Sequence, residues 1–161
     1  AGQNVASAAA ASASLPTDPF SPFLLGDQNI RVIATTALPE GAPSQDIKAA
    51  EWTYSLMMHM SDGLGGNCTY CHNSRSFFVW EASTPARVTA WHGIRMARDL
   101  NVAYLDPLRD AYPANRLGPD GDAPKANCAT CHAGLAKPLN GVSMVKDYVG
   151  LGTPAPAPAT Q

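Results

Sequence analysis

The spacing of apolar residues in the middle of the chain predicts two helices. In the first, Tyr54, Met57 and Met58 recur at intervals of three and four residues, which places them on one helix face. Ser44 is of the type that caps a helix N-terminus, and glycines at positions 63, 65 and 66 favour the helix end. The pattern therefore predicts a helix over residues 44–60.

Thr84 and Pro85 mark the start of the second predicted helix, because threonine is a good N-cap and proline is favoured at the first helical position. The pattern continues to about residue 100. Val88, His92 and Met96 are spaced by four residues and so share one face. We expect these three side chains to point inward.

Turn-forming residues dominate the segments around the helices. Prolines at positions 16, 19 and 22 predict an extended segment, and a stretch rich in proline and glycine after the second helix predicts a long loop. Residues 30–36 are rich in β-branched side chains. They predict either one short strand or a stretch that drapes across the edge of a bound group.

The length of 161 residues favours a single domain. Residues 1–14 are rich in alanine and serine, and residues 151–161 are rich in proline and alanine. Such segments bury too little apolar surface to order themselves. We therefore expect two flexible ends flanking one domain over residues 15–150.

The four cysteines of the chain fall into two copies of the pattern C-x-x-C-H, which is the attachment signature of c-type haem. The two thiols of a motif reach the two vinyl groups of one porphyrin, and the histidine binds the iron as proximal ligand. The sequence therefore predicts two covalently attached haem c groups. The predicted attachment and proximal residues are Cys68, Cys71 and His72 in the first motif and Cys128, Cys131 and His132 in the second.

Zinc binding and disulfides are the two alternatives for these cysteines. A zinc ribbon separates its cysteine pairs by roughly 15–20 residues, whereas Cys68 and Cys128 are 60 residues apart. Zinc also does not require a histidine directly after each pair. Redox disulfides of the thioredoxin type belong to a βαβ pattern, which this sequence lacks around its first pair. The motifs favour haem over both alternatives.

A repeated unit of helix, turn and C-x-x-C-H organises the domain. It occurs over residues 44–72 and again, with a longer loop, over residues 84–132. The fold class that this repeat predicts is mainly α: a small multihaem cytochrome c of two such units with long irregular loops.

Composition and charge exclude some classes of function. The formal charge is −2, and no basic run or aromatic–basic platform points to nucleic acid. No stretch approaches the ~20 apolar residues of a membrane span. The first residues lack the features of a signal peptide, so we expect any such peptide to have been removed. Because bacteria attach haem c outside the cytoplasm, we expect a periplasmic protein, soluble or peripherally associated with the membrane.

The distal axial ligands are harder to predict than the proximal ones. Met57 lies eleven residues before Cys68, and a helix along the haem face would direct its thioether at the iron. Met58 and Met60 are alternatives, and methionines at helical spacing commonly pack cores instead.

For the second haem, His92 is the candidate, with Met96 as the alternative on the same helix. His59 lies roughly opposite Met57 on its helix. It is a further candidate for a ligand, a hydrogen-bond donor to a ligand or an exposed residue.

Long segments of the chain resemble a known family. Trp52 to Phe77 is similar to the third haem segment of the tetrahaem cytochrome subunit of purple bacterial photosynthetic reaction centres. Thr84 to Met96 and Asn115 to His132 are similar to its fourth haem segment, and Pro19 to Leu25 resembles the entry to that half. The resemblance covers roughly residues 15–150, which correspond to the C-terminal half of that subunit.

The resemblance implies roles for both haems. In that family the third haem takes its methionine from the helix just before it, which implies Met57 here. The third haem re-reduces the bacteriochlorophyll special pair after photo-oxidation, and the fourth haem sits next in the chain with two histidine ligands. One of those histidines belongs to the half of the subunit that this sequence does not include. We therefore expect the second haem to use His92 or Met96, a residue of a partner chain, or five-coordinate iron.

Two functions follow from these observations. The first is single-electron transfer through two haems, with a reaction centre core or another redox protein as acceptor and a soluble cytochrome c or similar protein as donor. This interpretation makes the protein an electron carrier and not an enzyme. The alternative is a dihaem enzyme or a gas- or peroxide-binding protein with an open second iron. Arg75 and Arg87 are candidates to pair with haem propionates, or are ordinary surface arginines.

Overall fold

The computed structural model describes residues 13, 15–16, 18–32, 46–143, 145–148 and 150. The predicted flexible ends lie almost entirely outside these residues, as do Ser44 and most of the predicted 30–36 segment. Where the structure is described, it consists of helices, short helical turns and irregular segments and contains no strand. The prediction of a mainly α fold is confirmed. None of the described helices combines the length and apolar character needed to cross a membrane.

Helix α2 runs from Ile47 to Leu64 and carries the residues of the first predicted helix. Its N-cap is Asp46, whose side chain accepts a hydrogen bond from the backbone N–H of Lys48. The prediction that Ser44 caps this helix is therefore wrong, since an equally good capping residue lies two positions later. The helix ends at Gly65, which adopts the left-handed conformation that glycine tolerates best.

Helix α3 runs from Pro85 to Asp99 with Thr84 at its N-cap, as predicted. Its buried side carries Ile94, with the partly buried Ala90 and Ala97 beside it. Val88 and Met96 leave 37% and 64% of their surface exposed, and His92 is exposed as well. The prediction that these three residues form the inward stripe of α3 is therefore wrong.

The predicted loop after α3 is more helical than its prolines suggested. The chain continues from α3 into a π-helical turn, η3 (Leu100–Leu105), and two 3₁₀ turns, η4 (Asp106–Ala111) and η5 (Ala114–Arg116). Pro107 lies in the first turn of η4, where the missing N–H of proline costs no hydrogen bond. Similarly, the segment predicted to be extended near Pro22 contains a π-helical turn, η1 (Ser21–Leu25).

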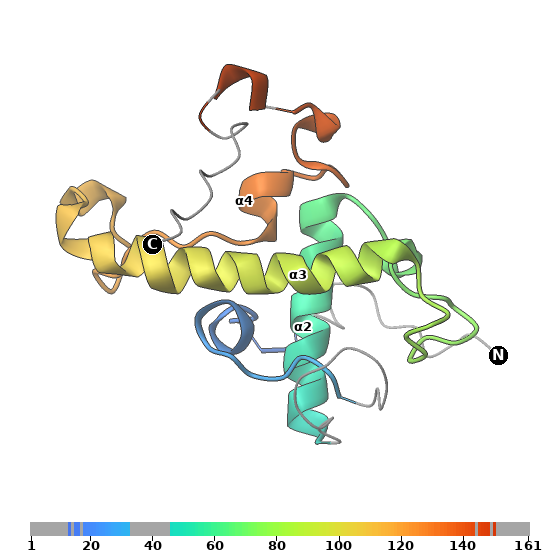
Figure 1. Ribbon diagram of the computed structural model, residues 1–161. Coiled ribbons are helices and arrows are strands. Elements are labelled where there is room, and N and C mark those ends of the chain that lie inside the picture. Colours follow the sequence, from blue (N-terminus) through green and yellow to red (C-terminus); the bar gives the residue numbers. More distant parts are fainter. Residues whose placement is uncertain are drawn as a thin grey trace, which may run out of the picture.

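The core lies where η1 meets helices α2 and α3. Its buried side chains are Phe23 and Leu24 of η1, Leu56 and Met60 of α2, and Ile94 of α3. In Figure 1, α3 crosses in front of α2, with η1 beside the crossing. This core is small, because only seven apolar residues of the described chain are buried.

A short helix, α4 (Cys128–His132), contains the second C-x-x-C-H motif and packs against the C-terminal end of α2. The backbone N–H of Gly134 donates to the carbonyl of Gly63 at 2.8 Å. A Cβ on Gly65 would lie 2.0 Å from the carbonyl oxygen of Gly134. Glycine is therefore required where the turn before the first motif meets the turn after the second.

Asn101 connects three segments behind the second motif. Its buried side-chain amide donates to the carbonyls of Leu24 and Ala126 at 3.1 and 2.9 Å. Its side-chain oxygen accepts from the N–H of Ala126 at 2.7 Å. Because a buried amide with all these bonds specifies one geometry, Asn101 fixes the approach of the chain to Cys128. The last described elements are the 3₁₀ turns η6 (Pro138–Gly141), which contacts α4, and η7 (Val145–Asp147).

Candidate functional site

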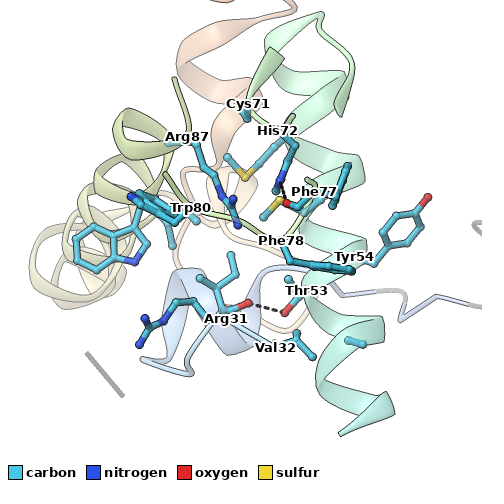
Figure 2. A pocket seen from close by; sticks show the side chains of 17 residues that line it. Arg31, Val32, Thr53, Tyr54, Cys71, His72, Phe77, Phe78, Trp80 and Arg87 are labelled. Carbon is cyan, nitrogen blue, oxygen red and sulfur yellow. Dashed lines mark hydrogen bonds between the residues drawn. The ribbon is translucent and has the colours of Figure 1, made fainter. Parts of the chain in front are cut away.

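A cavity of about 390 Å³ opens between α2, α3 and the segment that follows the first C-x-x-C-H motif. Its volume lies within the ~300–1,000 Å³ typical of cofactor pockets. Figure 2 shows the motif residues Cys71 and His72, the aromatic side chains and Arg87 arranged around it. The lining is Ile30, Arg31, Val32, Ala50, Thr53, Tyr54, Met57, Met60, Cys71, His72, Phe77, Phe78, Trp80, Arg87, Ala90, Trp91 and Ile94. The site is therefore largely apolar and rich in aromatic side chains.

The first motif begins in a 3₁₀ turn, η2 (Cys68–Tyr70), capped by the side chain of Asn67. Thr84 ties the motif to the start of α3: its N–H donates to the carbonyl of Cys71 at 3.2 Å, and its hydroxyl donates to the carbonyl of Tyr70 at 2.6 Å. These bonds hold Cys71 at the cavity wall, whereas Cys68 is exposed. The motif is thus held by the N-cap residue of α3 as well as by its own turn.

His72 is held on two sides. Its Nδ1 lies 3.0 Å from the carbonyl oxygen of Phe77, and its ring stacks face to face on the Phe77 ring with centroids 4.2 Å apart. Donation from Nδ1 leaves Nε2 free to bind a metal. Burial lowers the pKa of His72. The hydrogen bond to Phe77 acts in the opposite direction, and the positive charge of Arg87 lowers the pKa further. Burial therefore favours the neutral form of the imidazole, which is the form that binds a metal.

Met57 and Met60 line the same cavity as His72, and Met58 does not. Met60 is also part of the buried core, whereas Met57 packs at its edge and is only half-buried. The structure thus brings the predicted distal residue Met57 into one cavity with the predicted proximal residue His72.

His59 lies outside this cavity. Its ring packs edge-on against Phe20 at 4.6 Å, and its buried Nε2 has no hydrogen-bond partner. Burial lowers its pKa, against the effect of Asp62.

Arg87 is the charged residue closest to the motif in this cavity wall. Its guanidinium donates to the hydroxyl of Ser83 at 2.6 Å and lies 4.8 Å from the centre of the Trp80 ring. Burial raises the pKa of the Cys71 thiol, and the nearby Arg87 partly offsets that rise. Of the two arginines predicted to face haem propionates, Arg87 lines the cavity and Arg75 is exposed and does not.

The second motif is more open. Asn127 and Thr130 form a reciprocal capping box at the start of α4, and His132 Nδ1 lies 2.9 Å from the carbonyl oxygen of Leu135. Burial raises the pKa of the Cys128 thiol, which packs against the core, whereas Cys131 is exposed. A second cavity, of about 250 Å³, lies beside Asn101 and is lined by no residue of this motif.

The tentative ligands of the second haem, His92 and Met96, do not reach the first cavity. They lie on the exposed side of α3, and the His92 ring contacts Trp91 edge-on at 5.1 Å. Gly93, on the same helix, has open space around the position of a Cβ.

Zinc and disulfides find no support in this geometry. All four cysteines lie in the described part of the chain, and all four thiols are free. Among the described residues, no group of three or more histidine, cysteine, aspartate or glutamate side chains converges as a metal site would require.

The aromatic wall of the cavity was missed by sequence reasoning. Phe78, Trp80 and Trp91 line the site with Phe77. Three of these four residues follow His72 within eight positions, in a chain with few aromatic residues. That local density is a signal that could have identified them.

A mainly helical chain with two C-x-x-C-H motifs, one of them beside an apolar cavity, has the construction of a c-type cytochrome. The family model of the photosynthetic reaction centre cytochrome C subunit matches residues 1–152. The chain belongs to this family, and the resemblance found in the sequence is confirmed.

Three relatives are 40–56% identical to this chain over the residues that align with it. The photosynthetic reaction center cytochrome c subunit of Rubrivivax gelatinosus is 56% identical over 158 residues, which are 98% of this chain and 43% of the relative. That of Thermochromatium tepidum is 51% identical over 150 residues, 93% of this chain and 37% of the relative. That of Roseobacter denitrificans is 40% identical over 156 residues, 94% of this chain and 42% of the relative. The chain thus spans about two fifths of the length of these relatives.

Proposed function

We propose that this protein is a dihaem c-type cytochrome that carries single electrons on the periplasmic side of the membrane and donates them to a photosynthetic reaction centre. The observation that carries the proposal is the shared cavity of Met57, Cys71 and His72. A thiol that can bond to a haem vinyl group, and an imidazole and a thioether that can bind the iron, are what a c-type haem with methionine as sixth ligand requires.

At the first site the residues present fit this cofactor. Cys68 and Cys71 would form the two thioether bonds, His72 would bind the iron through Nε2, and Met57 would be the distal ligand. A haem bound there supplies a one-electron iron couple. Trp80 and Trp91 contribute apolar surface to the cavity wall, and Arg87 supplies a positive charge that favours the reduced iron.

At the second site, Cys128, Cys131 and His132 would hold the other haem. Large apolar side chains are exposed on α3, at the start of η3 and in the segment that follows the second motif: Met96, Leu100, Leu135, Leu139 and Val142. A haem beside His132 would cover apolar surface of this kind, which is costly to leave in water. His92, with Met96 as the alternative, is the proposed distal ligand.

The partner is inferred from the family. Each of the three relatives is a photosynthetic reaction center cytochrome c subunit. The docking partner proposed for this chain is therefore the core of such a reaction centre, and the electron donor is a soluble cytochrome c or a similar redox protein. Encounters of redox proteins are brief and bury little surface.

The test begins with the protein matured in a bacterial periplasm. The pyridine haemochrome spectrum and the intact mass should both give two haems per chain. Addition of carbon monoxide to the reduced protein should leave the spectrum unchanged, because both irons are six-coordinate. Reduced protein should also accelerate the re-reduction of reaction centres oxidised by a flash.

Three results would contradict the proposal: fewer than two haems, no acceleration with the wild-type protein, or rapid binding of carbon monoxide. The last would identify an open iron and favour a gas- or peroxide-binding protein. The variant Cys68→Ser/Cys71→Ser is the matched control for the flash experiment, since it retains the second motif.

A further inference from the structure

We propose that Phe77 is a positioning residue that sets the orientation of the His72 imidazole. Its carbonyl holds one nitrogen of the imidazole, and its ring holds the imidazole plane. The inference rests on the proposed haem site at the first motif and adds a residue that the C-x-x-C-H pattern does not include.

The two contacts restrict different motions of His72. The Nδ1···O distance of 3.0 Å to the Phe77 carbonyl fixes the tautomer and directs Nε2 away from the backbone. The stacked rings, with centroids 4.2 Å apart and planes within 1° of parallel, restrict rotation of the imidazole about its Cβ–Cγ bond. Together they leave the imidazole one orientation.

Phe77 is itself held in place by its neighbours. The backbone turns on either side of it are closed by hydrogen bonds from Ser76 N–H to the carbonyl of Asn73, at 3.1 Å, and from Val79 N–H to the carbonyl of Ser76, at 3.0 Å. The Phe78 ring meets the Phe77 ring edge-on at 6.0 Å. Phe77 nevertheless keeps 40% of its surface exposed, so burial alone does not account for its parallel stack on His72.

The second motif provides the internal comparison. His132 makes the equivalent Nδ1 contact, 2.9 Å from the carbonyl of Leu135, but Leu135 supplies no ring. Within the described part of the chain, no aromatic ring stacks on His132, although its motif has the same C-x-x-C-H pattern. The carbonyl contact is thus common to both motifs, and the stacked ring distinguishes the first.

The expected consequence is electronic as well as structural. The orientation of an axial imidazole determines how the iron d orbitals split, which the g values of the low-spin ferric state report. The Phe77 ring also covers one face of the imidazole, and greater access of water favours the charged ferric state.

The experiment compares Phe77→Leu and Phe77→Tyr with the wild-type holoprotein. In Phe77→Leu, we expect one of the two low-spin ferric EPR signals to shift or broaden. We also expect the ratio of reduced to oxidised iron at that haem, at a fixed ambient potential, to fall about threefold or more. Phe77→Tyr keeps the ring and should restore both readouts.

Val79→Ala is the matched control, because Val79 lies two residues after Phe77, is exposed and does not line the cavity. It should leave the g values unchanged. An unaltered EPR signal and iron ratio in Phe77→Leu, with the haem attached, would overturn the inference.

Haem content is measured first, so that the two proposals can fail separately. Wild-type protein without haem at the first motif would contradict the proposed function and not the role of Phe77. If Phe77→Leu does not mature, Phe77→Met replaces it, because methionine fills a similar volume but provides no planar ring. The same EPR comparison then decides the inference.

Discussion

The two C-x-x-C-H motifs of this chain share their local chemistry and differ in their surroundings. Around the first, α2, α3 and the segment after the motif enclose an apolar cavity that contains Met57 and Arg87. Around the second, α4 lies on the C-terminal end of α2, and the side chains predicted to face its haem, His92 and Met96, are exposed. Only around the first motif does the structure place a candidate distal residue, Met57, in one cavity with the histidine of the motif.

The comparison separates what a motif does locally from what the fold adds. The histidine of each motif reaches a backbone carbonyl a few residues later, that of Phe77 for His72 and that of Leu135 for His132. These contacts need only a short turn. A distal residue must come from another element, so it depends on how distant segments pack. The four predictions that follow test this difference.

Removing the attachment cysteines should have the largest effect, and an unequal one. Cys68→Ser/Cys71→Ser and Cys128→Ser/Cys131→Ser should each lose one haem per chain, measured by the haemochrome spectrum. The first pair should also lower the free energy of unfolding by about 3 kcal/mol or more, because the apolar cavity is left without its contents. Urea denaturation of the second pair should show a smaller loss. Equal losses would mean that the two haem sites contribute equally to the free energy of unfolding.

Met57→Leu should open the first haem to external ligands. Leucine fills a similar volume but cannot bind iron, so the reduced protein should bind carbon monoxide at one haem. The ratio of reduced to oxidised iron at that haem should fall about tenfold or more, since methionine ligation raises the potential. Met58→Leu is the control, because Met58 does not line the cavity. Carbon monoxide binding by the Met58 variant, and not by the Met57 variant, would show that the iron ligand is Met58 and not Met57.

Gly65→Ala should break the contact through which the two motif segments touch. Its φ is +64°, and a Cβ there would collide with the carbonyl of Gly134. We expect a loss of about 2–4 kcal/mol in the free energy of unfolding. In Gly66→Ala the nearest atom, Cβ of Tyr70, is at an ordinary 3.6 Å, so the cost should stay within about 1 kcal/mol. Similar denaturation midpoints for the two variants would show that the chain relaxes around the contact.

Asp18→Asn should have the smallest effect, because the exposed Asp18 makes only local hydrogen bonds at the start of η1. Burial raises the pKa of Asp18, but hydrogen bonds from Ser21 and from the N–H of Phe20 outweigh it and bring the pKa below 3.8. The carboxylate therefore stabilises η1 above pH 3.8, and this contribution is lost as the pH falls through the folded pKa. Asp18→Asn should cost a few tenths of a kcal/mol at pH 7. In urea titrations this difference should vanish once the pH lies well below the folded pKa of Asp18. A difference that persists there would exclude ionisation as its source.

Several features followed from short stretches of sequence. The start of α3 at Thr84 and Pro85 was predicted, because capping depends on adjacent residues. The start of α2 was placed two residues early, since Asp46 is as good a cap as Ser44. The segment after α3 was predicted to be a long loop, but it contains helical turns. Proline is tolerated in the first turn of a helix, as at Pro107.

The spacing of four residues on α3 misidentified its buried face. Ile94 and Ala90 are spaced in the same way as His92 and Met96, and periodicity alone does not say which row a neighbour covers. Phe23 and Leu24 of η1 make that choice, by packing against Ile94. Residues some seventy positions away thus decided which side of α3 faces inward.

The sequence by itself determined the two C-x-x-C-H motifs, the helices that precede them and membership of the family, because each of these features depends on residues that are close together in the sequence. Only the tertiary structure decided that Met57, His72 and Arg87 line one cavity and that His92 and Met96 stay exposed. These relations join side chains on separate elements. They depend on packing among α2, α3 and η1, which no short stretch of sequence specifies.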